Sequence, residues 1–416
     1  MPYKMTFASA DPEGALAFSL KYLGASETPQ PHTGGNGRCA LIKWCTFPGT
    51  KPTALGIDYQ FHFVKGYHRP NGSMTIDEFE DQMAALHGDF SRADATYDQY
   101  MDFHVTLAAD DLDVIAAKLV ADGVPLLARK SPDGASASIF VEMPHAIVLE
   151  IVGPSLSVVT PVAWSRCGAP KRPLQVDVRK ARRVVAASAR DTSTHAGSHS
   201  GGYFGYASEY NFGDGSVHSG VNGGVNGGNG TVAAVRKSPV RPLRAVYAST
   251  VPKEAADFVA WAFAGERVRP QSFLDGGNDS CVDAQAVRWT SATSDSSYEL
   301  VWIHSPKLPQ GKLPLDKYEA YLRALHGNLS KNIYDEYMDN HVALIFGDGD
   351  DVVRRLDARG VPFFMRGQYG EGADIFVEGP GGQIYELLCL HQTLRSDIPT
   401  WNLCGPLLAT DTPALA

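Results

Sequence analysis

The residues with the most chemical potential are isolated acidic side chains inside segments that otherwise have the pattern of buried strands. Glu386, for example, interrupts the apolar run Ile384–Leu388. A carboxylate is costly to bury without a partner, so Glu386 is expected either to face a cavity or to pair with a base such as Arg244. The sequence contains no nucleophile triad, phosphate-binding loop or redox cysteine pair.

The elements that must position such residues come from an internal duplication. The segment Tyr97–Val105 recurs as Tyr334–Val342, and the two copies differ only at their third and seventh positions. The same register extends outward in both directions, so the chain divides into two related halves, residues 1–167 and 242–405, followed by a tail, 406–416.

The segment between the halves, residues 168–241, is rich in Ser, Gly, Asn and His. Such a composition buries too little apolar area to offset its ordering entropy, so it predicts a flexible linker. Near its start lies a basic cluster: Arg179, Lys180, Arg182 and Arg183. This cluster is typical of a solvated helix end or linker segment, and the alternative is a docking or targeting patch.

Within each half, a strand–helix–strands pattern occurs twice. In the first half, the pattern predicts strands over 4–9, 39–47 and 57–64 around a helix that begins at Asp11-Pro12. A joining helix follows, with Thr75 and Glu78 as its capping box. The second module has strands over 103–107, 137–142 and 147–152 and a helix over 111–122. The predicted fold is therefore α+β, with four βαβββ modules in two tandem, duplicated domains.

The ends of the second and fourth modules, residues 140–150 and 376–386, resemble the vicinal oxygen chelate superfamily, which includes glyoxalase I, extradiol dioxygenases and bleomycin-resistance proteins. Both segments look like that family's strand, Pro-Gly-type turn and strand ending in a metal-binding glutamate. The resemblance implies that modules pair into curved sheets around a cavity. It also implies that the first and last strands of two modules supply metal ligands.

Carried over position by position, the resemblance implies ligands in both halves. They are Gln60, His104 and Glu150 in the first half and Glu299, His341 and Glu386 in the second. The remaining ligand position falls on Lys4 and Arg244, whose cationic side chains cannot coordinate a metal ion. These two residues, with His62 on the same strand face as Gln60, are predicted to line the substrate pocket.

One imidazole and two carboxylates are donors that suit a divalent cation such as Zn, Fe, Mn or Ni and leave positions open for substrate. The second half is therefore expected to hold the better site, with about one metal ion per chain. The leading hypothesis is a metal-dependent lyase, isomerase or dioxygenase that acts on a small oxygen-chelating substrate, with Glu386 or Glu299 moving a proton.

The main alternative is a metal-free protein that binds or sequesters a small molecule, similar to the bleomycin-resistance members. In that case Glu386 or Glu299 forms an ion pair with Arg244, and His104 and His341 are core histidines. The pairing of modules, within a half or across halves, stays open.

Composition narrows the partners and the compartment. The formal net charge of −9 and the pI near 5.8 offer no basic surface for nucleic acid. No apolar run is long enough to span a membrane. Six cysteines without a CxxC pair fit a reducing compartment. We therefore expect a cytoplasmic monomer or homodimer.

Overall fold

The computed structural model describes most of both halves, and every structural statement below refers to these residues. They are 2–28, 40–50, 57–66, 75–87, 90–92, 97, 103–130, 136–144, 146–163, 173, 175–194, 239–270, 283–291, 297–304, 315–329, 333–334, 340–367, 373–391 and 407–408. Most of the predicted linker, and most of the predicted tail, lie outside them.

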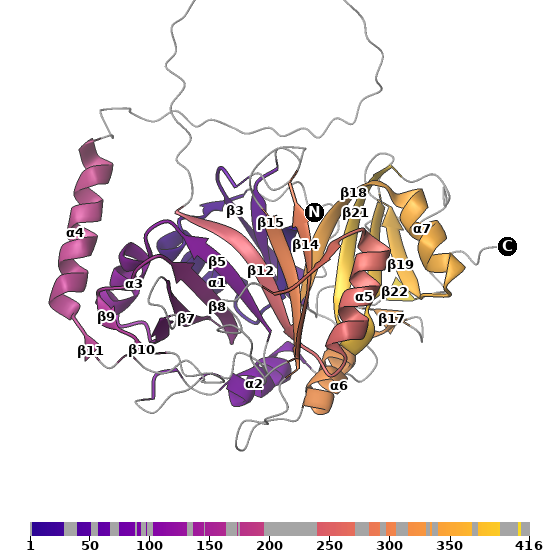
Figure 1. Ribbon diagram of the computed structural model, residues 1–416, viewed down its shortest axis with the longest axis horizontal. Coiled ribbons are helices and arrows are strands. Elements are labelled where there is room, and N and C mark those ends of the chain that lie inside the picture. The colour runs from indigo at the N-terminus through magenta and orange to yellow at the C-terminus, as the bar shows by residue number, and fades with distance from the viewer. Residues whose placement is uncertain are drawn as a thin grey trace, which may run out of the picture.

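In this part of the chain, one sheet has eight strands (Figure 1). Their order is β19 (Phe363–Gly367), β20 (Ala373–Glu378), β21 (Ile384–His391), β18 (His341–Asp348), β1 (Pro2–Ala8), β4 (Tyr59–Gly66), β3 (Ala40–Phe47) and β2 (Ser26–Glu27). At its centre, β1 pairs with β18 in antiparallel fashion. The first strands of two modules therefore meet, and the other strands of each module extend outward.

The second large sheet has nine described strands. Their order is β10 (Val162–Ala163), β6 (Leu126–Lys130), β7 (Ala137–Met143), β8 (Ile147–Gly153), β5 (His104–Ala109), β12 (Val240–Ala248), β15 (Ser297–His304), β14 (Asp283–Thr290) and β13 (Glu266–Val268). Here β5 and β12 are the antiparallel central pair. The two sheets thus repeat one plan.

Each module contributes one helix after its first strand: α1 (Pro12–Tyr22), α3 (Leu112–Ala121), α5 (Pro252–Phe263) and α7 (Gly349–Ala358). Aspartates cap three of them; Asp11, for example, accepts a hydrogen bond from the Gly14 amide at 2.9 Å. Helices α2 (Ile76–His87) and α6 (Leu315–His326) join the modules within each half and contact one another. Short pieces complete the described fold: β9 (Val159–Thr160), β11 (Gln175–Val176), β16 (Gly327–Asn328), β17 (Ile333–Tyr334), β22 (Leu407–Leu408) and a 3₁₀ turn (Pro380–Gly382).

The strand order confirms an α+β fold of four βαβββ modules. It also answers the question of module pairing, because each sheet combines modules from both halves. The first module pairs with the fourth, and the second pairs with the third. In Figure 1 the N-terminus accordingly lies beside β18. Residues 1–167 and 242–405 are therefore duplicated sequences whose modules are shared between two sheets.

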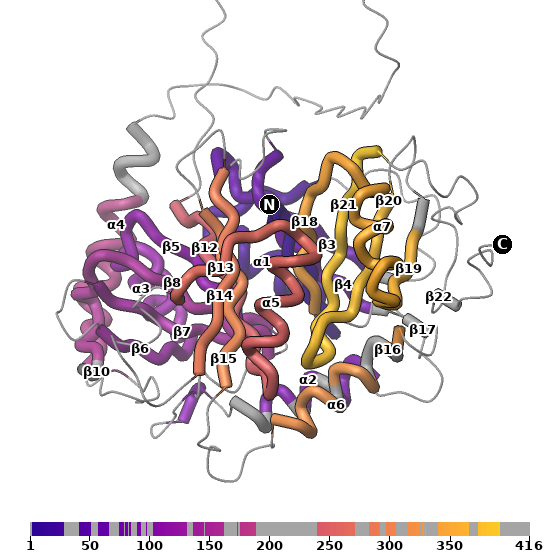
Figure 2. Tube along the Cα trace, turned by 45° about the vertical axis from the view of Figure 1, so that its right-hand side comes forward, coloured from indigo at the N-terminus to yellow at the C-terminus, as the bar shows by residue number. Residues whose placement is uncertain are grey.

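The two sheets share one apolar core. Along β1, Met5 and Phe7 belong to that core, and along β12 so do Ala245 and Tyr247. Helices α5 and α7 contact each other as they pack against their sheets (Figure 2). Because successive side chains of a strand point to opposite faces, Lys4 and Thr6 must lie on the face of the sheet away from Met5 and Phe7.

The structure corrects the predicted linker between residues 175 and 194. Helix α4 (Val178–Thr194) lies there and packs against α3 at one edge of the molecule (Figure 1), with Ala181 fully buried. The linker prediction rested on the average composition of residues 168–241, which does not reveal this one amphipathic stretch. Arg179, Arg182 and Arg183 lie on its exposed side. Among the described helices, none is long and apolar enough to cross a membrane.

Candidate functional site

On the eight-stranded sheet, the face away from the core carries two parallel rows of side chains that run across the strands. The lysine row consists of Thr46, Gln60, Lys4, Ala343, Glu386 and Phe376. The histidine row consists of Trp44, His62, Thr6, His341 and Ile384. The register of β1 with both neighbours therefore brings residues more than 300 positions apart onto one surface.

Glu386 is the charged centre of this face. The Lys4 Nζ lies 2.8 Å from its Oε1 and 2.6 Å from its Oε2. His341 Nε2 lies 3.1 Å from Oε2 and donates to it. Burial alone would raise the pKa of Glu386, but the positive charge of Lys4 and the hydrogen bond from His341 outweigh it and hold that pKa below its ordinary value. Glu386 is therefore an ionised carboxylate with its partners already in place.

His62 lies at the other side of Lys4. Its Nε2 is 2.9 Å from Gln60 Oε1, and its ring stacks on Trp44 with centroids 4.0 Å apart. Burial lowers the pKa of His62 well below its ordinary value, and the charge of Lys4 lowers it further. His62 is consequently neutral, and the prediction that His62 and Gln60 lie on one strand face is confirmed.

Two buried side chains of the histidine row have polar atoms without a hydrogen-bond partner in the described part of the chain. These are Thr6, through Oγ1, and His341, through Nδ1. The two residues are partners across the β1–β18 pair. Because Nε2 of His341 donates to Glu386, Nδ1 is the ring atom that remains for a further hydrogen bond.

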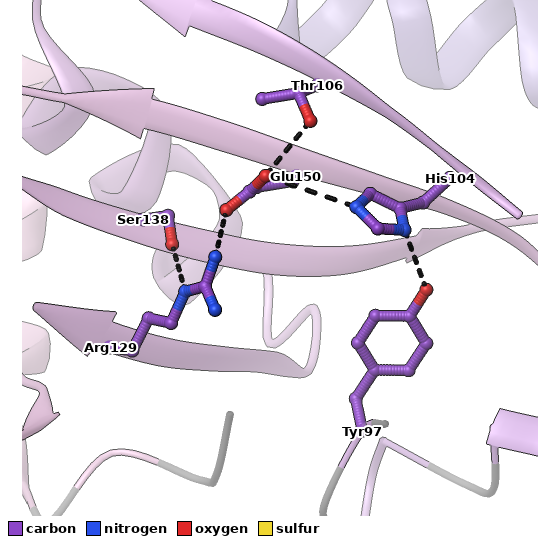
Figure 3. Close-up of polar contacts among 6 residues, drawn as sticks. All are labelled: Tyr97, His104, Thr106, Arg129, Ser138 and Glu150. Carbon is purple, nitrogen blue, oxygen red and sulfur yellow. Dashed lines mark hydrogen bonds and ion pairs between the residues drawn. The ribbon is translucent and has the colours of Figure 1, made fainter. Parts of the chain in front are cut away.

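The equivalent face of the nine-stranded sheet has a different character (Figure 3). Its first row, the arginine row, consists of Arg288, Glu299, Arg244, Thr106, Glu150 and Phe140. The second row consists of Ala286, Val301, Val246, His104 and Val148. Small or aliphatic side chains thus replace three polar or aromatic side chains of the histidine row. The replaced residues are Trp44, His62 and Thr6, and their counterparts here are Ala286, Val301 and Val246.

Glu150 is enclosed by hydrogen-bond donors. Arg129 Nη2 lies 2.7 Å from its Oε1, and Thr106 Oγ1 donates to Oε2 at 2.9 Å (Figure 3). His104 Nε2 is 4.0 Å from the same Oε2, and its Nδ1 is 3.3 Å from the hydroxyl of Tyr97. Burial alone would raise the pKa of Glu150, but the charges of Arg129 and Arg244 hold it below its ordinary value. This arrangement is a buried ion-pair network.

Glu299 lies in the same row and is also paired with an arginine. Arg288 contacts its Oε1 through Nε at 2.9 Å and through Nη2 at 2.6 Å. Arg244 is the neighbour of Glu299 in strand register and is almost fully buried. The arginine row thus contains two positively charged side chains, Arg244 and Arg288. In the lysine row, Lys4 is the only one among the described residues.

The predicted ligand sets do not converge in this arrangement. Glu299 lies in the nine-stranded sheet, whereas His341 and Glu386 lie in the eight-stranded one, so the expected site of one histidine and two glutamates in the second half is wrong. Gln60 is likewise separated from His104 and Glu150. Pairing of Glu386 with Arg244 is excluded by the same topology, and Glu386 pairs with Lys4 instead. The physical reason is the crossed pairing of modules, which no local pattern encodes.

The residues that are brought together do not fit a divalent cation. Each glutamate at a predicted ligand position already contacts a positively charged side chain: Glu386 contacts Lys4, Glu150 contacts Arg129, and Glu299 contacts Arg288. A divalent ion at these positions would be repelled by the neighbouring positive side chains. The carboxylate lone pairs that it needs already accept hydrogen bonds from those side chains. No group of three or more His, Cys, Asp or Glu side chains in the described residues is arranged to hold a metal ion.

Sequence reasoning missed the two arginines that complete the nine-stranded face. Arg129 follows the apolar run Leu126–Ala128, and Arg288 lies between Val287 and Trp289. An isolated arginine within a buried strand was the available signal, since such a charge needs a partner. Thr6 gave no such signal, because threonine is common in strands.

Comparison with known proteins gives structural matches at low sequence identity. No protein-family model and no curated protein matches the chain. Among solved structures, glyoxalase I from Zea mays has a TM-score of 0.46 at 8% identity, covering 93% of this chain and 92% of that one. A putative dioxygenase from Bacillus subtilis has a TM-score of 0.44 at 12% identity, covering 96% and 87%. An antibiotic-binding protein from Streptomyces sp. CB03234 has a TM-score of 0.21 at 17% identity, covering 35% and 92%. The chain's own strand order shows four βαβββ modules joined in two pairs through their first strands.

Proposed function

We propose that this protein binds an uncharged, polar small molecule on the histidine row of the eight-stranded sheet, without a metal ion. The observation that carries the proposal is the adjacent pair Thr6 and His341. Both side chains are buried, and each has a polar atom without a partner among the described residues. Buried polar atoms are nearly always hydrogen-bonded, so an adjacent pair of exceptions on one face indicates where a ligand would supply the missing bonds.

The electrostatics of this face favour a ligand without net charge. Lys4 and Glu386 compensate one another at 2.6 Å, and His62 is neutral because burial lowers its pKa. His341 Nδ1 would form one hydrogen bond with the ligand, and the Thr6 hydroxyl can donate or accept another. Aromatic rings lie on both sides of this polar pair. Trp44 stacks on His62, and Phe376 of the lysine row meets the His341 ring edge-on, with ring centroids 5.9 Å apart. An apolar portion of the ligand would find contacts there.

The same contacts argue against the catalytic roles predicted for Glu386 and Glu299. A general base works best when its pKa is near the working pH. The pKa of Glu386 is instead held low by Lys4 and His341, which makes its carboxylate a weak base. Glu299 is engaged by two donors of Arg288. Binding therefore accounts for these contacts better than metal-assisted proton transfer does.

Two matched substitutions test the proposal. Thr6→Val removes a hydroxyl that makes no hydrogen bond in the described structure, so the free energy of unfolding of the ligand-free protein should stay the same or rise. Thr106→Val removes the donor that Glu150 receives at 2.9 Å and should lower that free energy by about 1–3 kcal/mol. Urea unfolding of both variants measures the difference.

A thermal-shift screen of uncharged polar compounds supplies the second half of the test. Compounds that stabilise the wild-type protein should lose that effect in Thr6→Val and in His341→Ala, and should keep it in Thr106→Val. The proposal fails if Thr6→Val destabilises as much as Thr106→Val does. It also fails if stabilisation by every active compound is unaffected by both histidine-row variants.

A further inference from the structure

Lys4 occupies a special place among the side chains around Glu386. It lies in the lysine row between Gln60 and Ala343, and its Nζ is within 2.8 Å of both carboxylate oxygens. One positive group thus neutralises the whole carboxylate. The Lys4 side chain is 10% exposed and the Glu386 side chain 4%, so this contact is largely buried, and Lys4 is the more exposed partner.

The other groups around Lys4 are uncharged or acidic donors that a divalent cation accepts. His341 Nε2 and Glu386 Oε2 are 3.1 Å apart. Two ligands bound to one zinc ion at about 2.1 Å are separated by roughly 3.0–3.4 Å, so this pair already has a suitable spacing. Gln60 contributes an amide oxygen from the strand on the other side of Lys4, with His62 bonded to it at 2.9 Å.

We propose that the Lys4 ammonium stands in the place of a divalent cation on this face, and that Lys4 is the one residue that prevents the surrounding donors from binding a metal. Replacing Lys4 by histidine removes the charge and adds an imidazole beside Gln60, His341 and Glu386. This inference shares with the proposed function the premise that the wild-type face holds no metal ion, but it does not depend on which ligand binds there.

The nine-stranded sheet provides the matched control. Arg244 is the counterpart of Lys4 in the arginine row. Replacing it by histidine leaves Glu150 paired with Arg129 at 2.7 Å and Glu299 paired with Arg288 at 2.6 Å. In addition, His104 Nε2 and Glu150 Oε2 are 4.0 Å apart. Arg244→His should therefore gain no metal site.

The experiment measures Co²⁺ binding to untagged full-length wild-type protein, Lys4→His, Arg244→His and the double variant Lys4→His/Glu386→Gln. Visible absorption reports the coordination of the ion, equilibrium dialysis gives the affinity, and circular dichroism verifies folding. We expect Lys4→His to bind about one Co²⁺ per chain at least about 10-fold more tightly than the other three proteins. Changing a residue that only hydrogen-bonds to a metal ligand typically lowers metal affinity by about 10–100-fold, and loss of a ligand itself should cost no less.

The inference is overturned if folded Lys4→His binds Co²⁺ no better than the wild type or Arg244→His, or if the added Glu386→Gln change leaves the affinity unaltered. Should Lys4→His fail to fold, Lys4→Ala decides the question by the same measurements. It keeps Gln60, His341 and Glu386, so it must still bind Co²⁺ more tightly than the wild type.

Discussion

Replacement of Glu150 by glutamine should lower the free energy of unfolding by about 3–5 kcal/mol, the largest effect expected of any single change at these sites. Glu150 is fully buried and receives Arg129 at 2.7 Å and Thr106 at 2.9 Å. The variant removes the negative charge that the Arg129 guanidinium, whose side chain is 3% exposed, contacts at 2.7 Å. Urea unfolding at neutral pH, followed by circular dichroism, measures the loss.

An exposed ion pair serves as the control. Lys253 and Asp257 are 2.6 Å apart on the surface of α5, and both side chains are largely in solvent. Asp257→Asn should therefore change the free energy of unfolding by no more than about 1 kcal/mol. Equal losses in the two variants would show that Glu150 is not the centre of a buried network.

Cutting the chain between residues 195 and 238 should leave the two halves firmly associated. Each half supplies one module to each sheet, and the halves are joined along both central strand pairs, β1 with β18 and β5 with β12. Separation would expose four strand edges and split the shared core. We therefore expect a protein nicked at an inserted specific protease site to elute as one species in gel filtration, and to separate only under denaturing conditions.

Each half expressed alone provides the complementary result. Residues 1–194 and 239–416 should each be aggregated or poorly folded, and co-expression should restore a soluble pair, because neither half completes a sheet by itself. Two stable, monomeric halves that do not associate would contradict the crossed pairing of modules.

Local sequence patterns predict the elements of this fold well. Strands expected over 137–142 and 147–152 are β7 (Ala137–Met143) and β8 (Ile147–Gly153), and the helix expected over 111–122 is α3 (Leu112–Ala121). Alternation of side chains, aspartate caps and glycine stops are all local signals, so they can be read from neighbouring residues. The duplication adds the number and order of the modules.

The composition of the site could not be predicted in the same way. Lys4 meets Glu386 only because β1 pairs with β18. Arg244, the counterpart of Lys4, lies in the other sheet and neighbours Glu299 and Thr106 instead. Packing between segments hundreds of residues apart decides which modules pair. Local sequence patterns carry no information about this packing. The residues predicted from the sequence lie in these rows, but the groups in which they were expected to meet are wrong.

The two faces have diverged although their modules share one origin. At equivalent positions the eight-stranded sheet has His62 and Thr6, whereas the nine-stranded sheet has Val301 and Val246. The second face therefore surrounds its charged pairs with aliphatic side chains, which the first face lacks at these positions. We infer that the eight-stranded sheet carries the function and that the nine-stranded sheet contributes stability.

The metal content of the untagged wild-type protein is the most direct test of the claim that this face works without a metal ion. The protein would be dialysed against Zn²⁺, Mn²⁺, Ni²⁺ or, anaerobically, Fe²⁺, freed of excess ion and analysed by mass spectrometry of the elements, beside His341→Ala and Glu386→Gln. Because Lys4 already holds Glu386 at 2.6 Å, the wild type should retain no more metal than the two variants. About one tightly bound ion per wild-type chain, lost in both variants, would contradict the account.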